Sequence, residues 1–147
     1  MSTPALRILY DTNVLLDVLL RREPHAQAAA QLWDAAHRGI ISGVVSAISL
    51  PTISYLVGRG YSADQARSDV RAVLATFEVA PVGRPELETG LDETFASDYE
   101  DGVVHASAAR SGCSGIVTRD ATGFAGGEIP VYTPGELLAA LEVGRRE

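Results

Sequence analysis

The sequence predicts an α/β fold, in which a central, mostly parallel β-sheet lies between layers of helices. Two observations support this prediction. Short apolar segments of strand length alternate with longer segments in which apolar residues recur at helical spacing. Polar residues that can cap helices follow several of the apolar segments directly. Because each strand–helix–strand connection is a crossover, this alternation favours a parallel sheet that is covered on both faces.

The 147 residues contain no internal repeat and no linker rich in Pro, Gly or Ser, so we expect one α/β/α sandwich domain spanning residues 1–147. Short apolar runs predict strands at residues 6–10, 40–45, 78–82, 116–118 and 129–132. Helices are expected between them, at residues 14–19, 26–37, 46–56, 62–77, 85–95 and 97–110, with a closing helix from residue 134.

Boundary residues support several of these helices. Pro24 precedes the second helix and Gly39 follows it, which matches the preference for Pro near a helix start and Gly past its end. Ser46 and Ser62 are expected to cap the third and fourth helices, and Pro134 is expected to open the last one.

Apolar positions at helical spacing define the expected core. Val14 and Val18 recur one turn apart on the first helix, and Trp33 is expected in the core with the leucines around it. In the helix over residues 85–95, Leu87 and Leu91 are expected to face inward.

The charge composition excludes several kinds of chemistry. All 12 basic residues are arginine, and with 19 acidic residues the formal net charge is −7. Without lysine, a P-loop, a Schiff-base enzyme and a receiver-type phosphorylation switch are all excluded. The acidic balance argues against non-specific binding of long nucleic acid. A polyanion would need a bound cation or a local arginine patch, for which Arg119 and the pair Arg21–Arg22 are the best candidates.

The remaining composition favours a soluble, cytoplasmic protein. Cys113 is the single cysteine, so no internal disulfide can form, which suits a reducing compartment. The N-terminus reaches Asp11 too soon to contain the apolar region of a signal peptide. The least polar stretch, residues 43–57, is too short to span a bilayer.

Acidic residues are expected to gather at one edge of the sheet. Asp11 follows the first predicted strand and Asp120 follows the fourth, and the carboxyl ends of parallel strands share the edge where ligands bind. Asp98 and Asp101 lie three residues apart at the start of the helix over residues 97–110, with Glu100 beside them. When that helix end faces the same edge, three or four carboxylates converge on one pocket.

Converging carboxylates raise one another's pKa, and a hard divalent cation relieves their repulsion. Mg²⁺ and Mn²⁺ prefer oxygen ligands and commonly bridge protein carboxylates to a substrate phosphate. We therefore expect Asp11, Asp98, Asp101 and Asp120 to be metal ligands and catalytic acids in phosphodiester hydrolysis.

The same residues have simpler structural interpretations. Residues 11–13 are also typical of a helix cap, residues 97–101 have the form of a capping box, and Asp120 is typical of a turn. His105, four residues after Asp101, is interpreted as a packed or solvated histidine. We interpret Cys113 as structural, because no histidine lies close to it in the sequence.

Taken together, four stretches resemble the PIN domain family, whose best-known members are the VapC-type toxins of toxin–antitoxin pairs. They cover essentially the whole chain: ILYDTNVLLD from residue 8, DYEDGVVHA from residue 98, IVTRD from residue 116 with Phe124 after it, and IPVYTPGELL from residue 129.

The resemblance implies a parallel sheet between helices, Mg²⁺ or Mn²⁺ held by acidic residues, and endonucleolytic cleavage of RNA. On its pattern Asp11, Asp101 and Asp120 match the first, third and fourth acids, and Asp98 resembles an additional acid found in one branch. It also implies a small antitoxin and a second copy of the chain as partners. The residues expected at the substrate are Asn13, Thr118 and Arg119.

One departure from the family pattern keeps an alternative open. Many members carry a glutamate on the helix after the second strand, but this chain has no acidic residue between Asp34 and Asp64. Ser49, Thr52 and Ser54 are the polar groups available there. The alternative is therefore a catalytically impaired PIN-fold protein that binds or regulates a partner without cutting RNA.

Overall fold

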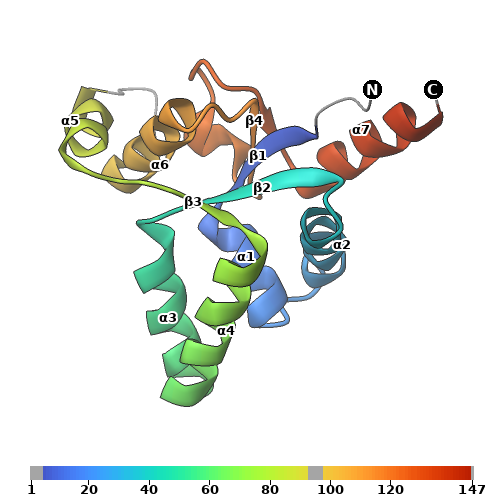
Figure 1. The fold of residues 1–147 in the computed structure, drawn as a ribbon, viewed down its shortest axis with the longest axis vertical. Helices are drawn as coiled ribbons and strands as arrows, with labels where there is room; N and C mark the ends of the chain where they lie inside the picture. Colours follow the sequence, from blue (N-terminus) through green and yellow to red (C-terminus); the bar gives the residue numbers. More distant parts are fainter. Residues whose placement is uncertain (1–4, 93–97, 147) are drawn as a thin grey trace.

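The computed structural model describes residues 5–92 and 98–146, which contain a five-stranded, fully parallel sheet (Figure 1). The strands lie in the order β3-β2-β1-β4-β5. They are β1 (Leu6–Tyr10), β2 (Ile41–Ser46), β3 (Glu78–Ala80), β4 (Gly115–Val117) and β5 (Val131–Tyr132). The chain builds outward from β1 to β3 and then returns to the other side of β1, so the strand order reverses between β1 and β4. The predicted parallel sheet is confirmed.

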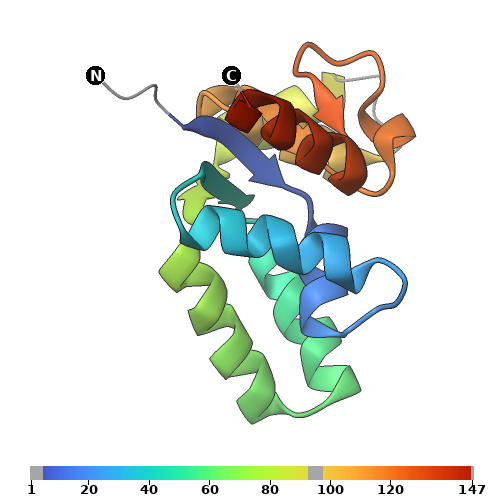
Figure 2. The same ribbon diagram turned by 90° about the vertical axis from the view of Figure 1, so that its right-hand side faces the viewer.

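Helices cover both faces of this sheet, as the sequence predicts (Figures 1 and 2). They are α1 (Thr12–Leu19), α2 (Ala26–His37), α3 (Ser49–Gly60), α4 (Ala63–Thr76), α5 (Arg84–Asp92), α6 (Tyr99–Arg110) and α7 (Pro134–Arg146), with a short 3₁₀ helix, η1 (Ala121–Phe124). Helices α3 and α4 pack as a pair that extends away from the sheet (Figure 1). None of the described helices is both long enough and apolar enough to cross a membrane.

The core consists of two layers, one on each face of the sheet. Ile8 and Tyr10 of β1 pack with apolar residues of α1, α2, α3, α4 and α7 on one face. Leu9 packs with residues of α6 and η1 on the other face. Successive side chains of a strand point to opposite faces, so an almost continuously apolar strand such as β1 supplies both layers.

Aromatic contacts join β1 to the helices below it. The rings of Tyr10 and Phe77 pack in a T-shaped arrangement with 4.8 Å between centroids, and the rings of Trp33 and Phe77 do the same at 5.2 Å. The buried hydroxyl of Tyr10 donates a 2.6 Å hydrogen bond to the carbonyl of Leu32 in α2. A Cβ at Gly43 of β2 would lie 2.7 Å from a ring carbon of Phe77, so glycine is required for this close packing.

Helix α5 packs on α6 through small residues, which corrects one prediction. Leu87 and Leu91 do not face inward: they are 39% and 69% exposed. Glu86 and Gly90 are buried instead. A Cβ at Gly102 of α6 would lie 2.6 Å from the carbonyl oxygen of Gly90, so the two helices approach too closely for larger side chains. Apolar spacing alone does not reveal such a contact.

Two of the predicted helix caps have different outcomes. Ser62 is the N-cap of α4 and accepts a 3.0 Å hydrogen bond from the N–H of Gln65, as expected. Ser46 is not a helix cap, because it is the last residue of β2 and α3 begins only at Ser49. Its buried hydroxyl accepts a 3.0 Å hydrogen bond from Ser107 of α6. The sheet therefore extends one residue further than expected at this edge.

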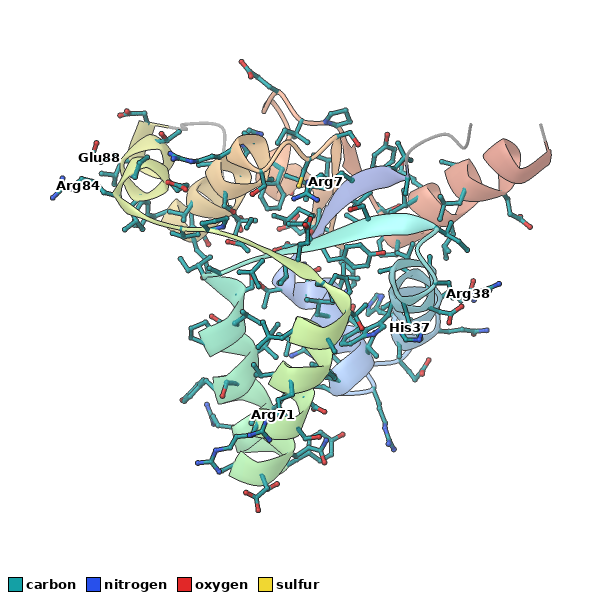
Figure 3. The ribbon with its side chains drawn as sticks, in the orientation of Figure 1. Arg7, His37, Arg38, Arg71, Arg84 and Glu88 are labelled. Atoms are coloured by element: carbon teal, nitrogen blue, oxygen red, sulfur yellow. The ribbon has the colours of Figure 1, made fainter. Side chains whose placement is uncertain are left out.

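Charged side chains on the outer helices lie at the surface (Figure 3). Arg84 and Glu88 project from α5 and pair at 2.7 Å, and His37 lies with Arg38 at the C-terminal end of α2. The predicted end of the helix over residues 85–95, and Ser97 of the predicted capping box, lie outside the described residues.

Candidate active site

The ends of β1 and β4 place Asp11 and Thr118 side by side, at the point where the strand order reverses. Tyr10 pairs with Val117 in the parallel register, and the N–H of Asp11 continues the ladder with a 3.0 Å bond to the carbonyl of Val117. Ligands of open parallel sheets bind outside the carboxyl ends of the strands at such a reversal. Asp11 is therefore at the expected edge.

Hydrogen bonds hold both oxygens of the Asp11 carboxylate. The hydroxyl of Thr118 donates to Oδ2 at 2.8 Å, and the N–H of Thr12 donates to Oδ1 at 2.8 Å. The Thr118 hydroxyl in turn accepts from the side-chain amide of Asn13 at 3.2 Å and from the N–H of Asp120 at 3.1 Å. These bonds bring Asp11, Asn13 and Thr118 together, and they also fix the backbone of Asp120 beside them.

Negative charge accumulates around Asp11. Burial raises the pKa of its carboxyl from 3.8 to about 6, although the two hydrogen bonds that it accepts lower it, and the nearby carboxylates of Asp101 and Glu100 raise it further. Partial burial raises the pKa of Glu100 as well, and so do the charges of Asp98 and Asp101. The acidic start of α6 therefore lies near enough to Asp11 for its charges to raise the pKa of that carboxyl.

Asp98 and Asp120 have structural partners of their own. The carboxylate of Asp98 caps α6 by accepting a 2.8 Å hydrogen bond from the N–H of Asp101. The carboxylate of Asp120 is exposed and accepts a 2.6 Å hydrogen bond from the hydroxyl of Thr122. The simpler interpretation of Asp98 as a cap is confirmed, and a role as a metal ligand stays a prediction for both residues.

The donors present at this edge suit a hard divalent cation. Among residues 5–92 and 98–146, no three acidic, histidine or cysteine side chains form a ready-made metal cluster. Mg²⁺ does not need one, since it usually keeps several waters and binds one or two protein carboxylates together with substrate phosphates. Asp11, buried and close to the charge of Asp101, fits such a two-carboxylate site, and a cation would relieve their mutual repulsion.

A hydroxyl of α3 lies next to this edge, on the helix where the family resemblance implies a glutamate that this chain lacks. The side chain of Thr12 donates a 2.7 Å hydrogen bond to the hydroxyl of Ser49, which is fully buried. Of the polar candidates on α3, Ser49 thus contacts the residue that directly follows Asp11.

Sequence reasoning missed Asp17, which holds the side chain of Arg119. The carboxylate of Asp17 is 1% exposed and accepts hydrogen bonds from Arg119 Nε at 2.5 Å and Nη2 at 3.1 Å. Arg22 lies 3.8 Å from the same carboxylate. The signal in the sequence was a lone acid between Leu16 and Val18 on an otherwise apolar helix. A buried carboxylate requires a cationic partner.

The two other reactive residue types near the core have structural roles. His105 is buried on α6, which fits a packed histidine. Cys113 is buried, and burial raises the pKa of its thiol to about 11. Since the thiolate is the nucleophilic form, Cys113 is unsuited to nucleophilic catalysis at neutral pH.

Comparisons with known proteins agree with this geometry. A protein named Ribonuclease VapC1, from Aquifex aeolicus, is 24% identical over 135 residues, covering 88% of this chain and 92% of the relative. A toxin–antitoxin complex from Klebsiella pneumoniae contains a chain of similar fold, with a TM-score of 0.66 and 25% identity over 86% of this chain and 97% of that one.

More distant structures share the fold alone. The toxin VapC20 of Mycobacterium tuberculosis, described as cleaving the sarcin–ricin loop, has a TM-score of 0.66 at 15% identity, covering 81% of this chain and 95% of that one.

Residues 7–122 match the family described as the PIN domain. That match includes Asp11, the acidic start of α6 and Thr118, and it spans most of the sequence. The chain belongs to the PIN domain family.

Proposed function

We propose that this protein is a metal-dependent endoribonuclease that hydrolyses RNA phosphodiester bonds and acts as the toxin of a type II toxin–antitoxin pair. The observation that supports it best is the buried carboxylate of Asp11, which lies where the strand order reverses and is influenced by the charges of Asp101 and Glu100. Its family membership and a relative named as a ribonuclease support the same reaction class.

Asp11 and Asp101 are the proposed primary ligands of Mg²⁺ or Mn²⁺, with Asp98 and Asp120 completing the acidic site and contributing to catalysis. When bound, the cation would supply an activated water and stabilise charge on the phosphate. Asn13, Thr118 and Arg119 are proposed to contact or orient the substrate.

Neighbouring residues orient the Asp11 carboxylate for this reaction. Thr118 and the N–H of Thr12 keep the Asp11 carboxylate in one orientation, and Asn13 keeps the Thr118 hydroxyl directed at it. These hydrogen bonds favour the ionised form of Asp11, whereas burial disfavours it. The orientation of the Asp11 carboxylate is thereby fixed before the cation or the RNA binds.

The direct test is cleavage of single-stranded RNA with Mn²⁺, with Mg²⁺ and with chelator. We expect cleavage only with metal, and its loss in Asp11→Asn and Asp101→Asn. Activity that survives in the double variant Asp11→Asn/Asp101→Asn would remove the assignment. Asp64→Asn, at an exposed position of α4, is the matched control.

A second candidate is a PIN-fold protein that regulates a partner without cutting RNA, because Ser49 lies next to Thr12 where an acid would strengthen metal binding. Calorimetry distinguishes the two. Absence of Mn²⁺ binding at millimolar metal favours the regulator, and binding that depends on Asp11 favours the nuclease.

The proposal extends to the partners and the setting of the protein. Similar folds occur in a toxin–antitoxin complex and in complexes named VapBC and FitAB, so we propose a small antitoxin as partner and a homodimer as the working form. We also propose that residues 1–147 act as one domain in the cytoplasm. A short reading frame for a DNA-binding protein directly upstream would support the pairing.

A further inference from the structure

A pocket of about 300 Å³ lies beside the candidate active site. Its walls come from the segment before α2, from α2 itself, from Arg119 and from the first turn of α7. Arg119 stands between Thr118 and Asp120, so this pocket borders the residues that surround Asp11. Its volume lies at the lower end of the range of small-molecule sites, about 300–1,000 Å³, which suits one nucleotide.

The positive charge beside the pocket comes from two arginines. The buried carboxylate of Asp17 is shared by Arg119 and Arg22, so two guanidinium groups are balanced by one acid. Asp17 engages Nε and Nη2 of Arg119, and Nη1 carries further donors. Because Asp17 holds two of its nitrogens, the guanidinium of Arg119 has a fixed orientation. This preorganisation favours the binding of an anion at the pocket.

The other walls suit a base rather than a second phosphate. Pro24, Ala28 and Pro134 offer apolar surface, and the exposed ring of His25 stands among them. Unpaired RNA bases stack on such rings and on apolar side chains. The backbone N–H of His25 donates a 2.9 Å hydrogen bond to the backbone carbonyl of Arg22, which keeps the two residues in one turn of the chain.

The start of α7 is not itself the anion site. Glu136 accepts a 2.9 Å hydrogen bond from the N–H of Thr133, and Thr133 accepts one from the N–H of Glu136 at 3.2 Å. This reciprocal cap already satisfies the helix end and places a negative charge there. The positive charge of the pocket therefore comes from Arg119.

We propose that this pocket binds the nucleotide next to the scissile phosphate of the RNA, with a phosphate at Arg119 and the base against His25 and Pro24. Asp17 holds the guanidinium of Arg119 at the edge of the pocket. The inference rests on the proposed nuclease function, but the pocket can be tested without any cleavage.

The test is a proton NMR titration in chelator with each nucleoside 5′-monophosphate in turn. The chain has three histidines, so the ring signals can be followed individually. We expect the His25 signals to shift at millimolar nucleotide. The signals of His37, at the far end of α2 (Figure 3), should stay in place.

Two glycines of α7 provide a matched pair of variants. A Cβ at Gly135, which lines the pocket, meets no atom within 4 Å, and the same holds at Gly144 near the other end of the helix. Gly135→Leu should fill the pocket and abolish the His25 shift, whereas Gly144→Leu should retain it. In RNA cleavage, Gly135→Leu should raise KM about tenfold and leave kcat nearly unchanged. Should Gly135→Leu fail to fold, Ala28→Leu fills the pocket from α2.

Several results would overturn the proposal. They are the absence of any His25 shift with nucleotide, an equal shift with inorganic phosphate alone, and a shift that persists in both pocket-filling variants. A His25 shift without RNA cleavage under any metal would instead contradict the nuclease function and leave a nucleotide pocket. The two proposals can thus fail separately.

Discussion

The carboxylate of Asp11 at the end of β1 accepts a 2.8 Å hydrogen bond from the hydroxyl of Thr118 at the end of β4. The two strands are neighbours in the sheet although 107 positions separate the residues in the chain. This bond joins the ends of β1 and β4 at the candidate metal site. It also makes the protonation of Asp11 depend on a residue contributed by the second half of the sequence.

We expect Asp11→Asn to stabilise the metal-free protein while it abolishes activity. The folded-state pKa of Asp11, about 6, lies above the ordinary value of 3.8, so the folded state holds this proton more tightly than the unfolded chain. Stability is therefore lost as the pH rises through this interval. Above it, Asp11→Asn should have a free energy of unfolding higher by about 1–3 kcal/mol.

Urea denaturation in chelator measures this difference. The gain should shrink as the pH falls towards the ordinary pKa of aspartate, because the unchanged protein then carries a neutral Asp11 too. A variant that is less stable than the unchanged protein at neutral pH would contradict the burial of an ionised Asp11.

Thr118→Val should shift the pH dependence of RNA cleavage towards alkaline pH. The hydrogen bond from Thr118 lowers the pKa of Asp11, so its loss raises that pKa and leaves less of the ionised form at neutral pH. We expect roughly tenfold lower kcat/KM at neutral pH and partial recovery at higher pH. Thr52→Val, on α3, is the control, and an unshifted profile would show that Thr118 does not tune Asp11.

Metal should raise the thermal stability of the protein through the same carboxylates. A ligand at a hundred times its Kd stabilises the folded state by about 2.7 kcal/mol. We expect Mn²⁺ to raise Tm by several degrees and chelator to reverse the rise. Asp11→Asn and Asp101→Asn should remove the effect, whereas Asp64→Asn should keep it. Equal shifts in all the variants would mean that the metal binds elsewhere.

The strand ends could be predicted from the sequence because their signal is local. Asp11 directly follows an apolar run, and Thr118 with Asp120 follows another, so a parallel sheet brings them to one edge. The cap at Ser62 could also be predicted, because its partner lies three residues away. Local signals of this kind are present in the sequence, although the similar prediction of a cap at Ser46 was wrong because β2 extends to that residue.

Contacts between distant segments could not be predicted in this way. Asp17 and Arg119 are 102 positions apart, and no local pattern relates them. The inward face of α5 was assigned wrongly, because the close approach of Gly90 to Gly102 overrides the apolar spacing of the helix. Residues 93–97, which connect α5 to α6, lie outside the described structure.

The approach of α5 to α6 makes Gly102 a sensitive position. A Cβ there would lie 2.6 Å from the backbone oxygen of Gly90, so Gly102→Ala should push the helices apart and lower the free energy of unfolding by about 1–3 kcal/mol. Because Asp101 is the preceding residue, RNA cleavage should fall as well. Gly144→Ala has open space and should be neutral or stabilising. Equal stability of the two variants in urea denaturation would refute the tight contact.

Replacing Ser49 with glutamate tests whether the acid that this chain lacks on α3 would strengthen metal binding. Ser49 is buried and bonded to Thr12, so Ser49→Glu would place a third carboxylate near Asp11. Without metal, the added charge should destabilise the protein, since a buried carboxylate without a cationic partner is unfavourable. With Mn²⁺, the same carboxylate becomes a ligand, so the metal-induced rise in Tm should exceed that of the unchanged protein. Ser54→Glu, further along α3, should change neither quantity. A Ser49→Glu variant that loses stability equally with and without Mn²⁺ would show that a carboxylate at this position of α3 does not bind the cation.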